Sequence, residues 1–266
     1  MTAVVGILCQ DGVVVGTDSS ATFSAGIHRT IEQETKKIEI VSDRIIIAGT
    51  GQVGLGQRFK RIVDKENQSN KFQKKTTETA IEVATHLYRE TIKDFISPFQ
   101  PISPYPIPPP GHSALPPLNE YGAVLAFPLG KEMYLCEFAI QGFQPELKTE
   151  HMWFVSMGSG QPITDPFLGF LRKIFWKERA PTLSEGILAA TWALQHAIEL
   201  NPGGINGPIQ LAILSIDTQT SKPKAKILPD SDLQEHNESV KAVEAYLAKY
   251  PKEVQSESAK KIPEPS

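Results

Sequence analysis

The chain has 266 residues, of which 40% are hydrophobic and 21% charged, and its formal net charge is −3. This composition is ordinary for a globular protein, and the length suffices for one large domain or two small ones. The weak charge and the lack of lysine- or arginine-rich runs argue against nucleic-acid binding. No stretch reaches the roughly 20 apolar residues of a membrane span, and no secretory signal pattern is seen. We therefore expect a cytoplasmic protein with neither nucleic acid nor membrane as partner.

The two cysteines, Cys9 and Cys136, lie in apolar, strand-like runs and outside any Cys-x-x-Cys motif. Isolated cysteines in such runs are typical of buried free thiols in a reducing compartment. We therefore predict that they form neither a disulfide nor a metal site.

The first fifty residues have the pattern of antiparallel strands. Strands are expected at 3–10, 13–18, 35–41 and 44–48. Asp11-Gly12 between the first two is a strong hairpin signal, and Ser42-Asp43 predicts a second turn. The intervening residues 19–34 are a polar stretch to which we assign no element.

Paired helices and further strands follow. Amphipathic helices are expected at 52–70 and 77–96. Residues 97–119 contain nine prolines and predict a partly polyproline loop, inserted into the domain. Later strands are expected at 120–128, 132–139, 149–156, 208–216 and 222–227, and later helices at 162–175 and 183–199.

The last of these helices begins at a capping box, Thr182-x-x-Glu185. Helices that come in pairs between hairpin-linked strands favour antiparallel sheets over a doubly wound parallel sheet. We therefore predict an α+β fold, a four-layer αββα sandwich, over residues 2–228. Residues 229–266 are expected to add a charged helix at 231–249 and a flexible polar tail.

A glycine motif, Gly49-Thr50-Gly51-Gln52-Val53-Gly54, matches the G-x-G-x-x-G pattern of dinucleotide sites. The strand before it belongs to a hairpin, and no parallel strand follows within about 30 residues, as such a site requires. Two other interpretations stay open: a tight strand-to-helix turn, or a catalytic turn.

The second residue, Thr2, could carry chemistry of its own, because threonine is small enough for methionine aminopeptidase to remove Met1. A free N-terminal threonine holds both a hydroxyl nucleophile and an amine base, which titrates at about 7.7–8.0 in model peptides. Such a site also needs a cation, a carboxylate that holds the cation, and a backbone N–H for the oxyanion.

Further segments with suitable chemistry occur in order along the chain. They are Thr2-Ala-Val-Val-Gly-Ile, Gly16-Thr17-Asp18-Ser19, Lys36-Lys37-Ile38, Ala48-Gly49-Thr50-Gly51, Met157-Gly158-Ser159-Gly160-Gln161 and Asn201-Pro202-Gly203-Gly204. In this order they resemble the β-type subunits of proteasomes, a family of N-terminal-nucleophile hydrolases, over about residues 2–227. Among bacterial relatives, the betaproteobacterial proteasome homologue is the branch that we expect.

The resemblance implies a set of site residues. Thr2 would attack, Asp18 and Lys37 would tune it, and the Gly49 N–H would bind the oxyanion. The remaining implied residues are Ser159 and Glu199 in support, and Ala21, Ile47 and Gly51 in a substrate pocket.

Some of these residues have plainer interpretations. Asp18 could end a strand and bind turn amides, Lys37 could be solvated, and Ser159 could cap a helix. Lys36 competes with Lys37 for the role of the cation.

The chain also departs from the family pattern. Glu199 stands where the family usually has Asp, and Pro202 stands where it has Ser. The arginine common in relatives two residues after the catalytic Asp is absent, since the chain reads Ser19-Ser20.

The resemblance further implies a threonine peptidase without metal or cofactor, assembled with itself into stacked homo-oligomeric rings. Polypeptides would be its substrates, and an ATP-dependent unfoldase is a further partner that the resemblance raises. Two other functions stay open from the sequence: a non-catalytic ring scaffold with this fold, and an N-terminal-nucleophile amidase for small molecules.

Overall fold

The computed structural model describes the chain except for residues 26–27, 74–78, 98–119, 201–203 and 255–266. Nearly all of the predicted proline-rich loop, and most of the predicted tail, therefore lie outside the described residues. By its contacts the chain divides into two units, Met1–Leu228 and Pro229–Ser266. No helix in the described ranges combines the length and hydropathy that crossing a bilayer requires.

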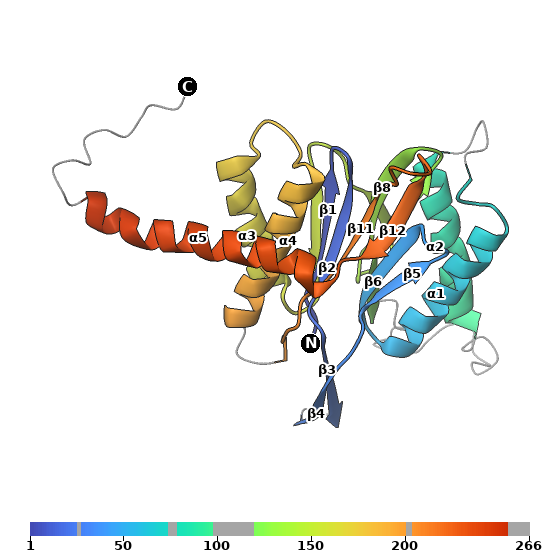
Figure 1. The fold of residues 1–266 in the computed structure, drawn as a ribbon. Helices are drawn as coiled ribbons and strands as arrows, with labels where there is room; N and C mark the ends of the chain where they lie inside the picture. The colour runs from blue at the N-terminus through green and yellow to red at the C-terminus, as the bar shows by residue number, and fades with distance from the viewer. Residues whose placement is uncertain (26–27, 74–78, 98–119, 201–203, 255–266) are drawn as a thin grey trace. The chain divides into compact units, whose positions relative to one another are not determined.

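The first unit contains two five-stranded antiparallel sheets (Figure 1). One has the order β10-β1-β2-β11-β12, from β1 (Val4–Cys9), β2 (Gly12–Thr17), β10 (Phe154–Met157), β11 (Gln210–Ile216) and β12 (Pro223–Ile227). The other has the order β5-β6-β7-β8-β9, from β5 (Ile38–Val41), β6 (Ile45–Gly51), β7 (Tyr121–Leu129), β8 (Glu132–Phe138) and β9 (Pro145–Leu147).

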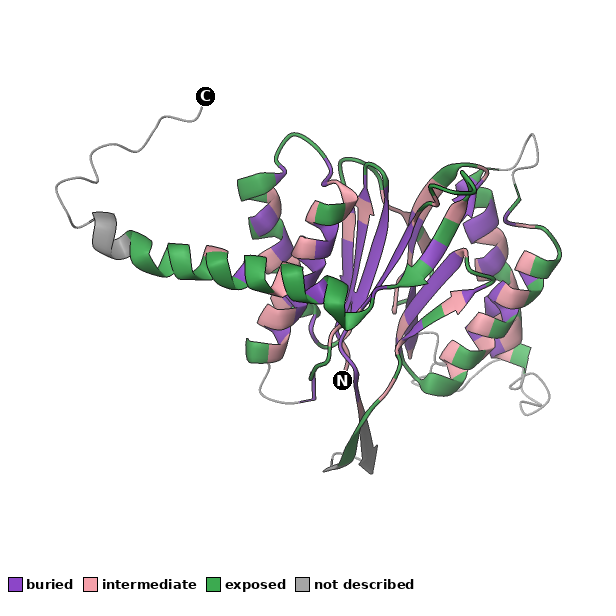
Figure 2. Ribbon diagram, viewed as in Figure 1, coloured by how far each residue is buried: buried purple, intermediate pink, exposed green. Residues whose placement is uncertain are grey.

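Helix pairs cover the outer faces of the two sheets. The helices are α1 (Val53–Gln68) and α2 (Ala80–Ile96) on the second sheet, and α3 (Gln161–Phe175) and α4 (Leu183–Leu200) on the first. The sheets face each other across an aliphatic core that includes Val15, Ile46 and Val124, and β7 is buried along its whole length. Strands β1, β2 and β7 are almost wholly buried, while the outer sides of the helices are exposed (Figure 2). The predicted α+β, αββα architecture is therefore confirmed.

The second core lies between the second sheet and its helix pair. The rings of Phe59, Phe138 and Phe143 pack against one another there, with centroids 5.0–5.4 Å apart.

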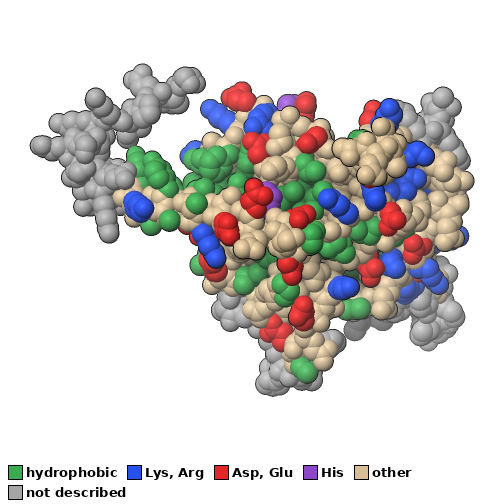
Figure 3. Space-filling view, viewed as in Figure 1, with side chains coloured by type: hydrophobic (Ala, Val, Ile, Leu, Met, Phe, Trp, Pro, Cys, Tyr) green, Lys and Arg blue, Asp and Glu red, His purple; other side chains and the backbone are tan. Residues whose placement is uncertain are grey.

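On the face drawn in Figure 3, the basic and acidic side chains are interspersed, and neither sign forms a patch of its own. Cys9 and Cys136 are buried and unpaired, as expected, and burial raises the pKa of both thiols, that of Cys136 to about 12.

The two predicted turns are present. Strands β1 and β2 pair from Val4 opposite Thr17 to Cys9 opposite Gly12. Ser42 and Asp43 both have positive φ, 51° and 53°, which is the mirror-image turn that matches the twist of hairpin strands.

Several segments differ from the sequence prediction, and among them is β9, for which no strand was expected. The polar stretch 19–34 contains a two-stranded ribbon, β3 (Ser20–Ala25) and β4 (His28–Glu34), which extends away from the large sheets (Figure 1). No core covers the exposed residues 31–34, so the ribbon lacks the apolar alternation that predicts strands. The strand expected at 149–156 is shorter, because β10 begins only at Phe154. In the second unit, α5 (Asp230–Val254) runs further than the expected 231–249.

The predicted capping box at the start of α4 is formed. Glu185 Oε2 accepts the Thr182 N–H at 2.7 Å, and the Glu185 N–H donates to Thr182 Oγ1. Arg179 adds a two-pronged ion pair at 2.7 Å, which together with the cap lowers the pKa of Glu185 to about 2. The next N–H, of Leu183, donates to Asp11, so the helix start is tied to the β1–β2 turn.

We predict that Glu185→Ala lowers the free energy of unfolding by about 1 kcal/mol near neutral pH. Because folding lowers the pKa of this carboxyl from 4.5 to about 2, its contribution is present above pH 4.5 and is lost as the pH falls towards 2. Urea unfolding at several pH values measures the difference, and Glu178→Ala, at an exposed position close by, is the matched control. Equal stability of Glu185→Ala and the parent chain at pH 7 would refute the assignment.

Candidate active site

Thr2 lies just before β1, held by the loop that follows β10. Its N–H donates to Ser159 Oγ at 3.0 Å, and its carbonyl accepts the Gly160 N–H at 3.1 Å. Gly158, directly before Ser159, has φ +87°, and a Cβ there would overlap the Thr2 carbonyl. The Gly-Ser-Gly segment therefore fixes the backbone of Thr2 by close approach that only glycine permits.

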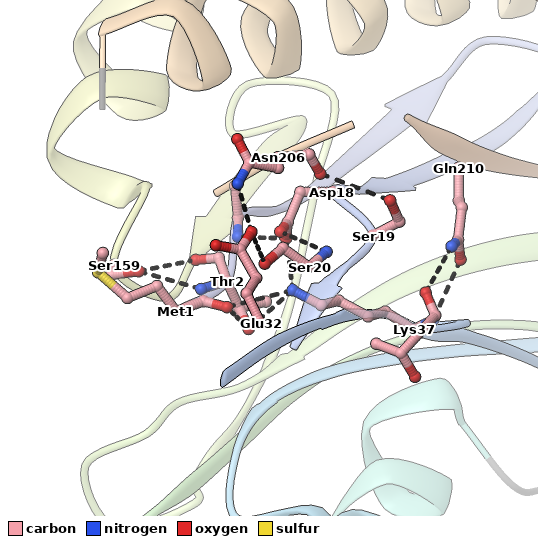
Figure 4. A network of polar contacts seen from close by, with 12 residues as sticks. Met1, Thr2, Asp18, Ser19, Ser20, Glu32, Lys37, Ser159, Asn206 and Gln210 are labelled. Atoms are coloured by element: carbon pink, nitrogen blue, oxygen red, sulfur yellow. Dashed lines mark hydrogen bonds and ion pairs between the residues drawn. The ribbon is translucent and has the colours of Figure 1, made fainter. Parts of the chain in front are cut away.

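Lys37 reaches Thr2 from the start of the second sheet, directly before β5. Its Nζ lies 2.7 Å from Asp18 Oδ1 and 3.2 Å from Thr2 Oγ1 (Figure 4). The Lys37 side chain is 8% exposed and that of Asp18 is fully buried. Lys36 is exposed, so the structure brings Lys37 and not Lys36 to Thr2.

Asp18 lies directly after β2 and uses both carboxylate oxygens. Oδ1 accepts the Ala3 N–H at 2.9 Å in addition to the Lys37 ammonium, and Oδ2 accepts the Ser20 N–H at 3.1 Å. The plain interpretation of Asp18 as a binder of turn amides and the interpretation as the partner of the cation therefore hold together.

Burial lowers the pKa of Lys37 below the ordinary 10.5, while Asp18, and then Glu32, act in the opposite direction. A cation at hydrogen-bond distance from a hydroxyl favours the ionised form of that hydroxyl. The arrangement can therefore make Thr2 Oγ a better nucleophile than a solvated threonine hydroxyl.

Met1 is present in this structure, and its carbonyl accepts hydrogen bonds from Thr2 Oγ1 at 2.7 Å and Lys37 Nζ at 3.2 Å. The nitrogen of Thr2 is thus an amide here and stands in the place of the free amine that removal of Met1 would create.

The glycine motif forms a strand-to-helix turn between β6 and α1. Strand β6 lies between two antiparallel neighbours, β5 and β7, so it belongs to no β-α-β unit, which removes the support for a dinucleotide site. Gly51 has φ +105° and packs against the Glu120 carbonyl. Thr50 Oγ1 lies 3.0 Å from where a Cβ of Gly158 would stand, so the end of β6, with Gly49 next to Thr50, lies beside the loop that holds Thr2.

The expected pocket residues have different environments. Ala21 is half-buried in β3, and Gly51 is exposed at the end of β6. Ile47 is buried in the core under α1 and α2. Glu199 is exposed near the end of α4, and the hydrogen bonds described do not join it to Thr2. Pro202 lies outside the described residues.

Sequence reasoning missed four polar residues around the site. Glu32 Oε1 accepts hydrogen bonds from Ser20 Oγ and Asn206 Nδ2. Gln210 Oε1 accepts the Lys37 N–H at 3.0 Å, and its Nε2 donates to the Thr35 carbonyl at 2.7 Å. The one available signal was Gln210, a polar residue directly before the apolar run 211–214 of β11.

The sequence model of a family described as Proteasome subunit matches residues 2–102. The "Proteasome subunit beta" of Methanococcus maripaludis (strain C5) is 34% identical over 84 residues, which are 32% of this chain and 37% of the relative. That of Methanocaldococcus sp. (strain FS406-22) is 25% identical over 241 residues, 91% of each chain. The alignments with the first three relatives span less than two-fifths of the relatives' length.

Two solved structures share the fold. Anbu (ancestral beta-subunit) from Yersinia bercovieri has a TM-score of 0.63 at 14% identity, over 93% of this chain and 95% of that chain. The Anbu (Gly-1) mutant from Hyphomicrobium sp. strain MC1 has a TM-score of 0.62 at 14% identity, over 96% and 99%. The chain is thus similar to proteasome subunits over residues 2–102 and to one archaeal proteasome β subunit over nearly its whole length, and it shares the fold of the two Anbu structures.

Proposed function

We propose that the chain is a threonine endopeptidase subunit that hydrolyses peptide bonds with Thr2 as the nucleophile. One observation carries the proposal: the Lys37 ammonium lies within hydrogen-bond distance of both the Asp18 carboxylate and the Thr2 hydroxyl. A scaffold without chemistry has no need to bury an ion pair beside a hydroxyl, since burying charges costs free energy.

The proposed reaction is acyl transfer in two steps. After removal of Met1, Thr2 Oγ attacks the substrate carbonyl, and its proton passes to the Thr2 amine and then to the departing amine of the substrate. Water next attacks the ester formed on Thr2, gives a proton to the same amine, and releases the acid product while the hydroxyl is restored. The Gly49 N–H serves as the oxyanion donor, a contact typically worth about 2.7–4 kcal/mol. Ser159 orients the amine, to which it is already bonded through the nitrogen of Thr2.

The similarity to proteasome subunits supports an assembly of this chain with itself. We propose stacked homo-oligomeric rings, with polypeptides as substrates and an ATP-dependent unfoldase as a further partner. The free, buried thiols of Cys9 and Cys136 suit the reducing cytoplasm in which we place the protein.

Thr2→Ala should lower peptide turnover by roughly 10³-fold or more, because it removes the nucleophile. Thr2→Ser is the matched control, since it keeps a primary hydroxyl and the amine and should retain measurable turnover. Cleavage of fluorogenic peptides, measured on samples of equal elution volume, tests both variants.

Intact-mass spectrometry supports the same comparison. The proposal requires the active protein to lack Met1 and to gain one adduct from a β-lactone inhibitor, at Thr2. Full activity of Thr2→Ala would reject the mechanism, and complete retention of Met1 would favour the scaffold.

Lys37→Ala should lower kcat by about 100-fold or more, because it removes the cation beside the attacking hydroxyl and leaves the Asp18 charge buried without its ionic partner. Lys36→Ala changes the exposed neighbour and should stay within twofold of the parent chain. Steady-state kinetics, together with melting curves that show both variants to be folded, give the comparison. Equal kcat in the two variants would contradict the role of Lys37.

The purified chain should elute as a multi-chain assembly, because the proposed rings enclose the sites. Light scattering coupled to size-exclusion chromatography measures the mass, and Thr2→Ala should give the same mass, because Thr2 is not required for assembly. A single-chain mass at micromolar concentration would reject the ring.

A further inference from the structure

We infer that Glu32 is a positioning residue for the Asp18–Lys37 pair, because its carboxylate holds Ser20 and Asn206, which both bond to the segment from Asp18 to Ser20. The inference rests on the function proposed above and extends its site to the β3–β4 ribbon.

Glu32 joins parts of the chain that are far apart in sequence. It lies in β4, and its Oε1 accepts hydrogen bonds from the hydroxyl of Ser20, in β3, and from the amide of Asn206, before β11. Figure 4 shows these side chains gathered beside Thr2 and Lys37. The ribbon is therefore tied at its base to the site.

Both residues that donate to Glu32 also form a hydrogen bond with Asp18 or with its neighbour Ser19. The Ser20 N–H donates to Asp18 Oδ2 at 3.1 Å, and the Asn206 carbonyl accepts the Ser19 N–H at 3.0 Å. The segment from Asp18 to Ser20 is thus held from two sides, by bonds that converge on the Glu32 carboxylate. With Oδ2 of Asp18 oriented in this way, Oδ1 is directed at the Lys37 ammonium.

Glu32 also acts by its charge. The charged groups that face Lys37 in the described part of the chain are the carboxylates of Asp18 and Glu32, and removal of Met1 adds the amine of Thr2. Glu32 raises the pKa of Lys37 against the effect of burial, and solvent screens this effect because Glu32 is exposed. The carboxylate therefore supports the ammonium form of Lys37 and the orientation of Asp18.

Two substitutions separate position from charge. Glu32→Gln keeps the size and an oxygen that accepts from Ser20 and Asn206, whereas Glu32→Ala removes the oxygen as well. Glu34→Gln and Glu34→Ala are the matched controls. Glu34 is exposed two residues further along β4, and none of the hydrogen bonds described involves its carboxylate.

For Glu32→Ala we expect kcat for a fluorogenic peptide to fall by about 10- to 100-fold, as misplaced catalytic groups cause, with KM changed less than threefold. Glu32→Gln should recover part of kcat. The alkaline limb of its profile of kcat/KM against pH should shift to lower pH than in the parent chain. The reason is that Lys37 loses a supporting negative charge, so the pKa of its ammonium falls. The Glu34 variants should keep the parent kcat and profile.

Melting curves show which variants are folded, and if Glu32→Ala unfolds, the pH profile of Glu32→Gln decides alone. Parent-level kcat in a folded Glu32→Ala variant, or an unchanged alkaline limb in Glu32→Gln where Glu32→Ala unfolds, would overturn the inference while the proposed function stands. If the proposed function itself is wrong, the result differs, because the parent chain would then show no peptide turnover that depends on Thr2.

Discussion

The fold is constrained by one buried ion pair, which joins the Lys37 ammonium to the Asp18 carboxylate beside Thr2. Removing such charges from water costs roughly several kcal/mol per ion, and their attraction offsets this only with good geometry and further hydrogen bonds. The 2.7 Å contact and the amides of Ala3 and Ser20 meet that requirement. The ion pair is therefore evidence of a built site more than of stability.

The two facing sheets bring these groups together from distant parts of the sequence. The β1–β2 hairpin returns the chain so that the Asp18 N–H donates to the Ala3 carbonyl, which sets Asp18 next to Thr2. The second sheet delivers Lys37 across the interface between the sheets, and Gln210 of the first sheet holds the Lys37 N–H. Thr2, Asp18 and Lys37 thus depend on pairing within or between the sheets, whereas Ser159 lies in the loop before α3 and Glu199 lies in α4.

The sequence was informative where one physical rule dominated. Apolar alternation and turn residues predicted both hairpins and the helix pairs, and the capping box predicted the start of α4. The sequence left Lys36 in competition with Lys37, and the structure brings Lys37 to Thr2. The β3–β4 ribbon could not be found in this way, because its residues 31–34 face solvent and carry no core pattern. Glu32 and Asn206 were missed for the same reason, since only pairing in three dimensions brings them to Asp18.

Anchoring of the Thr2 backbone has a consequence for conformational entropy. The first residues of a domain are usually poorly ordered unless they are tied down. Here the Thr2 carbonyl is bonded to Gly160, and the neighbouring Ala3 N–H is bonded to Asp18, so neither tie involves Met1. Removal of Met1 therefore leaves a new N-terminus that is already immobilised. Ordering a loose terminus costs about 1–2 kcal/mol per residue, and here that cost belongs to the folding of the domain and not to each catalytic turnover.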